Sequence, residues 1–135
     1  MKSVYSTPVK TMADCKYDYT CFDYSLYDKD TFAFETSRGC NQNCKFCLFK
    51  HNILKFKTEE KIIEDIKLLP SNCKYVCFTD NAINLTRKHL DRVLKIFSQY
   101  QYEWWSYLFV HTIKEEDIKR LIELDNELIK AFEDE

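Results

Sequence analysis

Three cysteines on one short stretch of the chain have the spacing of metal ligands. Cys40, Cys44 and Cys47 follow the pattern Cys-x3-Cys-x2-Cys, directly after an apolar run. Thiolates so close together suit one compact, soft metal centre, because a loop can return each sulfur to the same point. Structural zinc sites take four ligands and iron–sulfur clusters usually take four cysteines. A cluster held by only these three cysteines would therefore leave one iron open to another molecule.

The only glycine of the 135-residue chain, Gly39, directly precedes the first of these cysteines. Glycine adopts positive φ angles without strain and lets another stretch of backbone come close. A loop that folds around a metal centre needs both properties. We therefore expect Gly39 to shape the start of the cysteine loop.

The stretch 35–47 resembles the signature of the radical S-adenosylmethionine (radical SAM) superfamily. That signature is Cys-x3-Cys-x-aromatic-Cys, and Phe46 fills its aromatic position. The run Glu-Thr-Ser-Arg-Gly-Cys at 35–40 is more specifically similar to the branch whose members often carry a cobalamin-binding domain. The resemblance implies that the three cysteines bind a 4Fe–4S cluster and that S-adenosylmethionine completes the fourth iron. It also implies reductive cleavage of this cofactor to a 5′-deoxyadenosyl radical, which requires an electron donor and acts on an unknown substrate.

The resemblance further implies which residues contact S-adenosylmethionine. Phe46 would pack near the adenine. In the family, the end of the second strand meets the methionyl amino group, and the run Phe-Thr-Asp-Asn at 78–81 occupies that place here. Asp80 is the expected contact, because a carboxylate suits an ammonium group, and Asn81 lies beside it.

Two other interpretations of the three cysteines stay open. Together with His51 they could form a structural zinc site. They could also belong to a non-catalytic iron–sulfur protein or enzyme remnant, which needs only the cysteine loop. Ser106 and His111, near the end of the third predicted strand, fall where substrate or cofactor residues could lie, and both could equally be structural.

The other four cysteines are expected to be structural. An odd total of seven, with three clustered, argues against a secreted disulfide scaffold and favours a reducing cytoplasm. Cys73 and Cys77 share one side of a predicted strand, but they lie too far apart along it to bind one metal. We expect them, with Cys15 and Cys21, to be small buried hydrophobic residues.

The segments that position these residues alternate between strands and helices. Strands are expected at 31–35, 74–78 and 104–110, and helices from Thr58, after 84–86 and from about Lys114. Thr58 is a good N-cap, with two glutamates following it in the first turn. The second strand is apolar, so we expect it to be buried on both faces. The second helix has an apolar stripe, and His89 is expected near the boundary of its polar face.

These spacings fit right-handed βαβ units, so the predicted fold class is α/β with a parallel sheet of three βα units. The cysteine loop, Asp80 and His111 should then share the carboxyl edge of the sheet. By resemblance, this is half of the (β/α)6 partial barrel of the radical SAM superfamily. Residues 1–30 are expected to form an irregular, aromatic-rich extension, and 31–135 a truncated radical SAM core.

A half barrel would be incomplete as a standalone catalyst, because one wall of the cofactor site would be missing. Whether the chain is an enzyme by itself is therefore left open. The edge of the third strand is apolar, which favours self-association or a partner that completes the barrel.

Composition excludes several other classes of protein. A hydrophobic content of 45% with 16% aromatic residues is typical of a globular chain. The formal net charge of −2 gives no support for a nucleic-acid-binding surface. No apolar run approaches the ~20 residues that span a membrane, and the N-terminus lacks a secretory signal, so we expect a cytoplasmic protein without a membrane partner.

Overall fold

The centre of the molecule is a parallel sheet of three strands. The computed structural model describes residues 11–21, 23, 26, 30–47 and 53–123. The strands are β1 (Thr31–Phe34), β4 (Tyr75–Phe78) and β5 (Glu103–Trp105), in the spatial order β1–β4–β5. This sheet, with helices between its strands, confirms the predicted α/β class.

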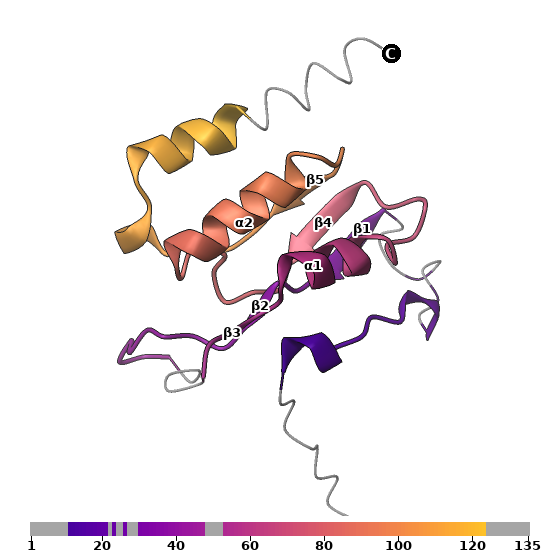
Figure 1. Ribbon diagram of the computed structural model, residues 1–135, viewed down its shortest axis with the longest axis horizontal. Coiled ribbons are helices and arrows are strands. Elements are labelled where there is room, and N and C mark those ends of the chain that lie inside the picture. The colour runs from indigo at the N-terminus through magenta and orange to yellow at the C-terminus, as the bar shows by residue number, and fades with distance from the viewer. Residues whose placement is uncertain (1–10, 22, 24–25, 27–29, 48–52, 124–135) are drawn as a thin grey trace, which may run out of the picture.

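The helices α1 (Glu59–Ile66) and α2 (Arg87–Phe97) lie on the same face of the sheet, and a third helical segment at 115–123 lies beside α2 (Figure 1). Short 3-10 turns occur at Met12–Asp14, Tyr19–Cys21 and Val110–Thr112. Within the described ranges, none of the helices has the length and apolarity required to cross a bilayer.

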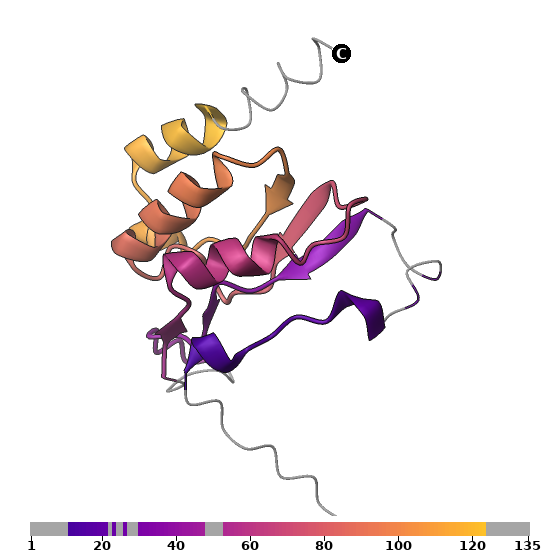
Figure 2. The same ribbon diagram turned by 45° about the vertical axis from the view of Figure 1, so that its right-hand side comes forward.

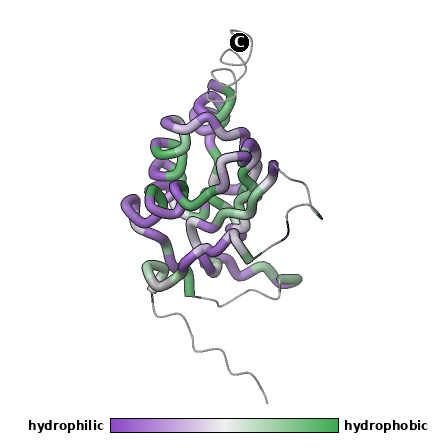
Figure 3. The backbone as a smooth tube through the Cα atoms, turned by 90° about the vertical axis from the view of Figure 1, so that its right-hand side faces the viewer, coloured by the Kyte–Doolittle hydropathy of each residue, from purple (hydrophilic) through white to green (hydrophobic). Residues whose placement is uncertain are grey.

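Both labelled helices begin where the sequence predicts. The side chain of Thr58 accepts a hydrogen bond from the Lys61 N–H (3.2 Å), and that of Thr86 accepts one from the His89 N–H (3.3 Å). Each threonine satisfies a backbone donor that the first helical turn leaves unpaired. Hydrophobic and hydrophilic stretches alternate along the chain, as expected of elements with one buried side (Figure 3).

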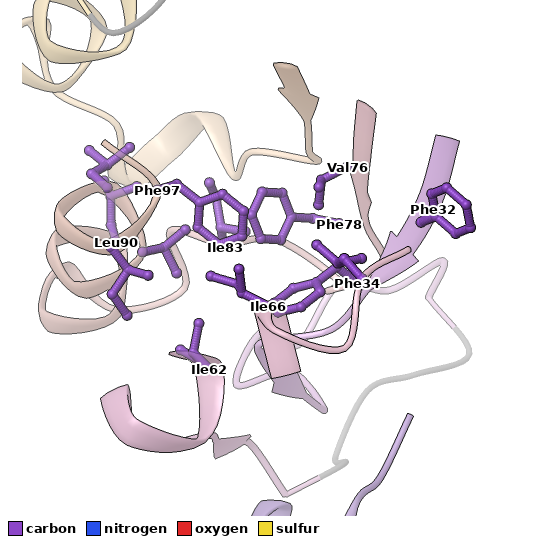
Figure 4. Packing of buried hydrophobic residues seen from close by; sticks show 13 residues of the cluster. Phe32, Phe34, Ile62, Ile66, Val76, Phe78, Ile83, Leu90 and Phe97 are labelled. Atoms are coloured by element: carbon purple, nitrogen blue, oxygen red, sulfur yellow. The ribbon is translucent and has the colours of Figure 1, made fainter. Parts of the chain in front are cut away.

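Aromatic side chains build the core between the sheet and α2. Phe34 of β1 and Phe78 of β4 lie opposite each other in the parallel register, and both meet Phe97 of α2. The ring centroids are 4.8–6.2 Å apart and the rings meet edge to face (Figure 4). Such pairs contribute about 0.5–1.5 kcal/mol each beyond the area that they bury.

The opposite face of the sheet is not covered by any element that the structure describes. Tyr75 is 39% exposed and Trp105 is 50% exposed on this face, and Cys77 between them is half-buried. The prediction that the second strand is buried on both faces is therefore wrong. Figure 2 shows the reason, since α1 and α2 both lie on the other side of the sheet.

The third strand is shorter than the predicted 104–110, because it ends at Trp105. After this point the chain bonds to the loop between β4 and α2 instead of continuing along β4. The side-chain amide of Asn84 accepts from the Phe109 N–H (2.7 Å) and donates to the Phe109 carbonyl (2.8 Å). A buried side chain thus replaces the neighbouring strand as the partner of this backbone.

An antiparallel pair of two-residue strands was not predicted. Ser37–Arg38 (β2) pairs with Lys55–Phe56 (β3), and the Lys57 N–H extends the pairing by donating to the Thr36 carbonyl (2.9 Å). We call the paired segments 36–38 and 55–57 the loop neck, because they close the cysteine loop, residues 39–54, at its base.

Two tyrosines that precede the sheet satisfy the outer edge of β1. The Tyr19 hydroxyl donates to the Ala33 carbonyl (2.8 Å), while the Tyr17 hydroxyl bonds both the N–H and the carbonyl of Glu35. These backbone groups point away from β4, so the tyrosines replace a neighbouring strand. Cys21 is exposed, in contrast to its predicted burial, and its thiol donates to the carbonyl of Asp18 (3.0 Å).

A buried ion pair joins the loop neck to α1. The ammonium of Lys57 lies 2.7 Å from a carboxylate oxygen of Asp65, and neither side chain is exposed. Lys61 bonds the other oxygen of Asp65 (2.7 Å), and the Lys57 ammonium also lies over the Tyr17 ring (4.3 Å). Buried charges need such partners, because water is not available to solvate them.

We expect Lys57→Met to lower the free energy of unfolding by about 3 kcal/mol, because it leaves the buried Asp65 with one cation fewer. Lys95→Met is the matched control, since Lys95 of α2 pairs with Glu59 of α1 on the surface of the molecule (2.8 Å). It should cost less than about 1 kcal/mol. Urea denaturation of both variants measures the difference, and equal losses would contradict the prediction.

Candidate functional site

The cysteine loop extends from the loop neck at the carboxyl end of the sheet. Cys40, Cys44 and Cys47 are half-buried, and none of the three forms a disulfide bond. The Cys47 N–H donates to the Cys44 carbonyl (3.1 Å), which closes a turn between these two ligand candidates. The Gln42 N–H points to the sulfur of Cys40 at 3.4 Å.

The three thiols fit a soft metal centre by their chemistry, because thiolates are the preferred ligands of iron–sulfur clusters and zinc. Their positions do not yet form one: among the described residues, no three cysteine, histidine or acidic side chains are close enough to hold one metal ion. His51, the alternative zinc ligand, lies outside the described residues. The donor set therefore fits a metal centre, and the three sulfurs must move closer together to form it.

Gly39 has the conformation that the sequence predicts, with a φ angle of +94°. A Cβ atom at this position would lie 2.3 Å from the Ile53 carbonyl oxygen. The close approach is between the two ends of the cysteine loop, so the glycine allows the loop to close at its neck. Any other residue here would be strained and would clash with backbone.

A buried carboxylate joins the start of this loop to the end of β4. Asp80 is 1% exposed. One of its oxygens accepts from the Thr36 N–H (2.9 Å), and the other accepts from the hydroxyls of Thr36 (2.8 Å) and Ser37. Both residues belong to the stretch that leads into Cys40.

Helix α2 holds the same region from a second side. His89 is 1% exposed, and its Nε2 lies 2.9 Å from the Thr36 hydroxyl, while its ring packs against Phe56. One turn later, Arg92 donates to the Lys57 carbonyl (2.7 Å). The helix thus contacts both segments of the loop neck. The expected place of His89 near the polar boundary is wrong, because its partner Thr36 lies in the core.

The hydrogen bonds at Asp80 decide its protonation. Burial raises the pKa of this carboxyl, but the nearby His89 and hydrogen bonds from Ser37 and Thr36 favour the charged form and together hold the pKa below the ordinary value of 3.8. The carboxylate is therefore ionised at neutral pH and accepts hydrogen bonds with both oxygens.

The other two predicted cofactor residues lie in the cysteine loop or beside it. Asn81 is exposed at the end of β4, and its side-chain amide donates to the Gly39 carbonyl (2.9 Å). Phe46 lies on the turn between Cys44 and Cys47 and is 90% exposed. The assignment of Phe46, Asp80 and Asn81 to S-adenosylmethionine stays a prediction.

Ser106 and His111 show only local contacts within the described chain. The Ser106 hydroxyl donates to the Tyr107 carbonyl (3.0 Å), and the exposed His111 ring packs edge to face on Phe109. Within the described residues, neither side chain contacts the three cysteines, so both keep the two interpretations that the sequence allows.

Cys73 and Cys77 differ from the loop cysteines in their surroundings. Burial, helped by the charge of Asp30, raises the pKa of Cys73 to about 11, and burial also raises the pKa of Cys77. Both thiols therefore resist forming the thiolate that a metal needs.

Sequence reasoning missed the roles of Thr36, Ser37 and His89 in this site. Thr36 and Ser37 stand inside the signature stretch, but the sequence gives no indication that their hydroxyls face Asp80. The available signal was the position of His89 four residues before Val93, which places the histidine on the apolar side of the helix.

We expect Gly39→Ala to lower the free energy of unfolding by about 1–3 kcal/mol, because the positive φ and the contact with Ile53 both become unfavourable. Asn43→Ala, an exposed change in the same loop, should leave stability within about 0.5 kcal/mol of the native value. Urea denaturation compares the two, and a native-like Gly39→Ala protein would refute this account of the glycine.

The stability that Asp80 contributes should depend on pH. A carboxyl whose pKa is lowered by folding stabilises the fold above its unfolded pKa, and this stabilisation is lost as the pH falls through the folded value. The difference in unfolding free energy between the native protein and Asp80→Asn should thus be constant near neutral pH and shrink below about pH 3.8. Urea denaturation across this range tests it, and a difference that grows on acidification would contradict the lowered pKa.

Comparison with known proteins gives one match. The family model of the Radical SAM superfamily matches residues 34–130, which is well over half of the chain. The match supports no particular branch, so the likeness to the cobalamin-associated branch stays a prediction. No curated protein and no solved structure matches the chain significantly.

Proposed function

The chain belongs to the radical SAM superfamily, and we propose that it binds a 4Fe–4S cluster through Cys40, Cys44 and Cys47. The observation that supports this most is the attachment of the cysteine loop to the carboxyl end of β4 by Asp80 and Asn81. In α/β folds, ligands bind at this edge of the sheet.

The chain's own residues would contribute soft ligands and a fixed loop base. None of the three cysteines is held in a disulfide bond, and the loop neck fixes both ends of the segment that carries them. When bound, the cluster would supply the electron for reductive cleavage of S-adenosylmethionine. The chain would hold the cluster and shield it from water.

We propose the Phe46 turn and the end of β4 at Asn81 as the region that receives S-adenosylmethionine. Phe46 presents an almost fully exposed ring, which is suited to stack on adenine. Asn81 is exposed beside Gly39, directly before the first cysteine. The uncovered face of the sheet, with Cys77 and Trp105, would form one wall of the site. Further strands, from the same polypeptide or from a partner, would form the other wall, and an electron donor would be needed.

Anaerobic reconstitution with ferrous iron and sulfide tests the proposal. The native protein should bind about four iron atoms per chain, and S-adenosylmethionine should change the electron paramagnetic resonance spectrum of the reduced cluster. Cys44→Ala should lose most of the iron, because one ligand of the proposed set is removed.

The matched control is Cys73→Ala, which removes a thiol outside the loop whose pKa is raised to about 11. It should keep the native iron content. Full iron loading in Cys44→Ala, or one zinc ion per native chain in place of iron, would rule the proposal out. A cluster whose spectrum does not change when S-adenosylmethionine is added would favour a non-catalytic iron–sulfur protein.

A further inference from the structure

We propose that Asp80 is a positioning residue, which holds the start of the cysteine loop against the carboxyl end of β4 and so sets where the three thiols stand over the sheet. This inference rests on the proposed function, since it assigns the thiols to a cluster. It gives Asp80 a role different from the cofactor contact that the sequence predicts.

Both oxygens of the Asp80 carboxylate are already hydrogen-bonded within the chain. They accept from the Thr36 N–H, the Thr36 hydroxyl and the Ser37 hydroxyl. A carboxylate has about four acceptor sites, so three of them are occupied. The His89 Nε2 lies 3.9 Å from one of the two oxygens. Because Asp80 is 1% exposed, a cofactor ammonium could reach it only after these hydrogen bonds broke.

The hydrogen bonds from His89 through Thr36 to Asp80 run in one direction. The Thr36 hydroxyl has one hydrogen, and it donates this to Asp80, which is an acceptor only. The hydroxyl must then accept from His89, so the Nε2 of His89 carries a hydrogen. The chain from His89 through Thr36 to Asp80 therefore has one consistent order, with α2 at one end and β4 at the other.

This network acts on the residues directly before Cys40. Asp80 holds Thr36 and Ser37, and the next residue, Asn81, holds the carbonyl of Gly39. These contacts fix three of the four residues directly before Cys40. Two neighbouring side chains at the end of β4 thus set the path by which the chain enters the cysteine loop.

The segment by which the chain leaves the cysteine loop is held by the same network. Lys57 lies in the second segment of the loop neck. Its N–H donates to the Thr36 carbonyl, and its carbonyl accepts from the guanidinium of Arg92 in α2. Anything that moves Thr36 would therefore move both ends of the loop. Asp80 acts on the thiols through the loop neck and not by touching them.

Hydrogen–deuterium exchange on the protein as purified tests the anchoring without any cluster. In Asp80→Asn, the Thr36 and Lys57 amides should exchange roughly ten- to a hundredfold faster than in the native protein, because a charged acceptor is lost. Asp117→Asn is the matched control: Asp117 is equally buried and accepts from the Lys114 N–H (3.0 Å), away from the loop neck. It should leave these two amides unchanged.

The reconstituted protein distinguishes positioning from contact. Asp80→Asn should keep a near-native iron content, since the cysteines remain. It should weaken the binding of S-adenosylmethionine about tenfold or more, as measured by the effect of the cofactor on the cluster spectrum. Thr36→Val should do the same, and Thr36→Ser should restore native behaviour, because serine keeps the hydroxyl. Asp80→Asn should weaken the binding of an analogue without the amino group by the same factor as the binding of S-adenosylmethionine.

If Asp80 touched the amino group directly, Thr36→Val would bind S-adenosylmethionine normally and the analogue would not respond to Asp80→Asn. Either result overturns the proposal, as does native exchange at Thr36 in the Asp80 variant. Should Asp80→Asn fail to fold, the two Thr36 variants carry the same test. A native protein that takes up no iron refutes the proposed function, whereas the exchange experiment still decides the anchoring.

Discussion

A buried carboxylate must be hydrogen-bonded, and meeting this requirement at Asp80 joins the parts of the molecule that carry its chemistry. An ionised group without water is stable only when donors surround it. Here the donors are Thr36 and Ser37 of the loop neck, and the histidine behind them comes from α2. The sheet, the helix and the base of the cysteine loop are therefore held at one point. The hydrophobic core positions the layers, whereas this polar point fixes the loop relative to them.

The aromatic core and the uncovered sheet face are two sides of the same arrangement. Phe34 and Phe78 pack on Phe97 because α1 and α2 both cover one face. The alternate residues of the same strands then point to the other face, where Tyr75 and Trp105 remain exposed. A strand has side chains on both faces, so covering a single face leaves the other available to whatever completes the site.

Local signals in the sequence predict much of this fold. Thr58 caps its helix through a bond to Lys61, only three residues away, and Gly39 is recognisable because no other residue tolerates its backbone angle. The parallel order of the strands follows from their spacing. The single-sided burial of β4 was not predictable, because an apolar strand reads the same whether one face or two are covered.

The missed features all depend on partners that are distant in the chain. His89 is buried by Thr36, which lies 53 residues before it, and Asn84 shortens the third strand by bonding Phe109, 25 residues after it. The loop neck consists of two-residue strands, which are too short for an alternating pattern. The cysteines were found from their spacing, but the side chains that hold their loop become apparent only when the chain is folded.

The tyrosines at the outer edge of β1 have a consequence for assembly. Tyr17 and Tyr19 occupy the backbone groups of Glu35 and Ala33 that another strand would need. A sheet with two free edges can add copies at both ends and grow into a filament. Among the described residues, the tyrosines thus leave the β5 edge open to another strand, and pairing of two identical copies through β5 would give a closed pair.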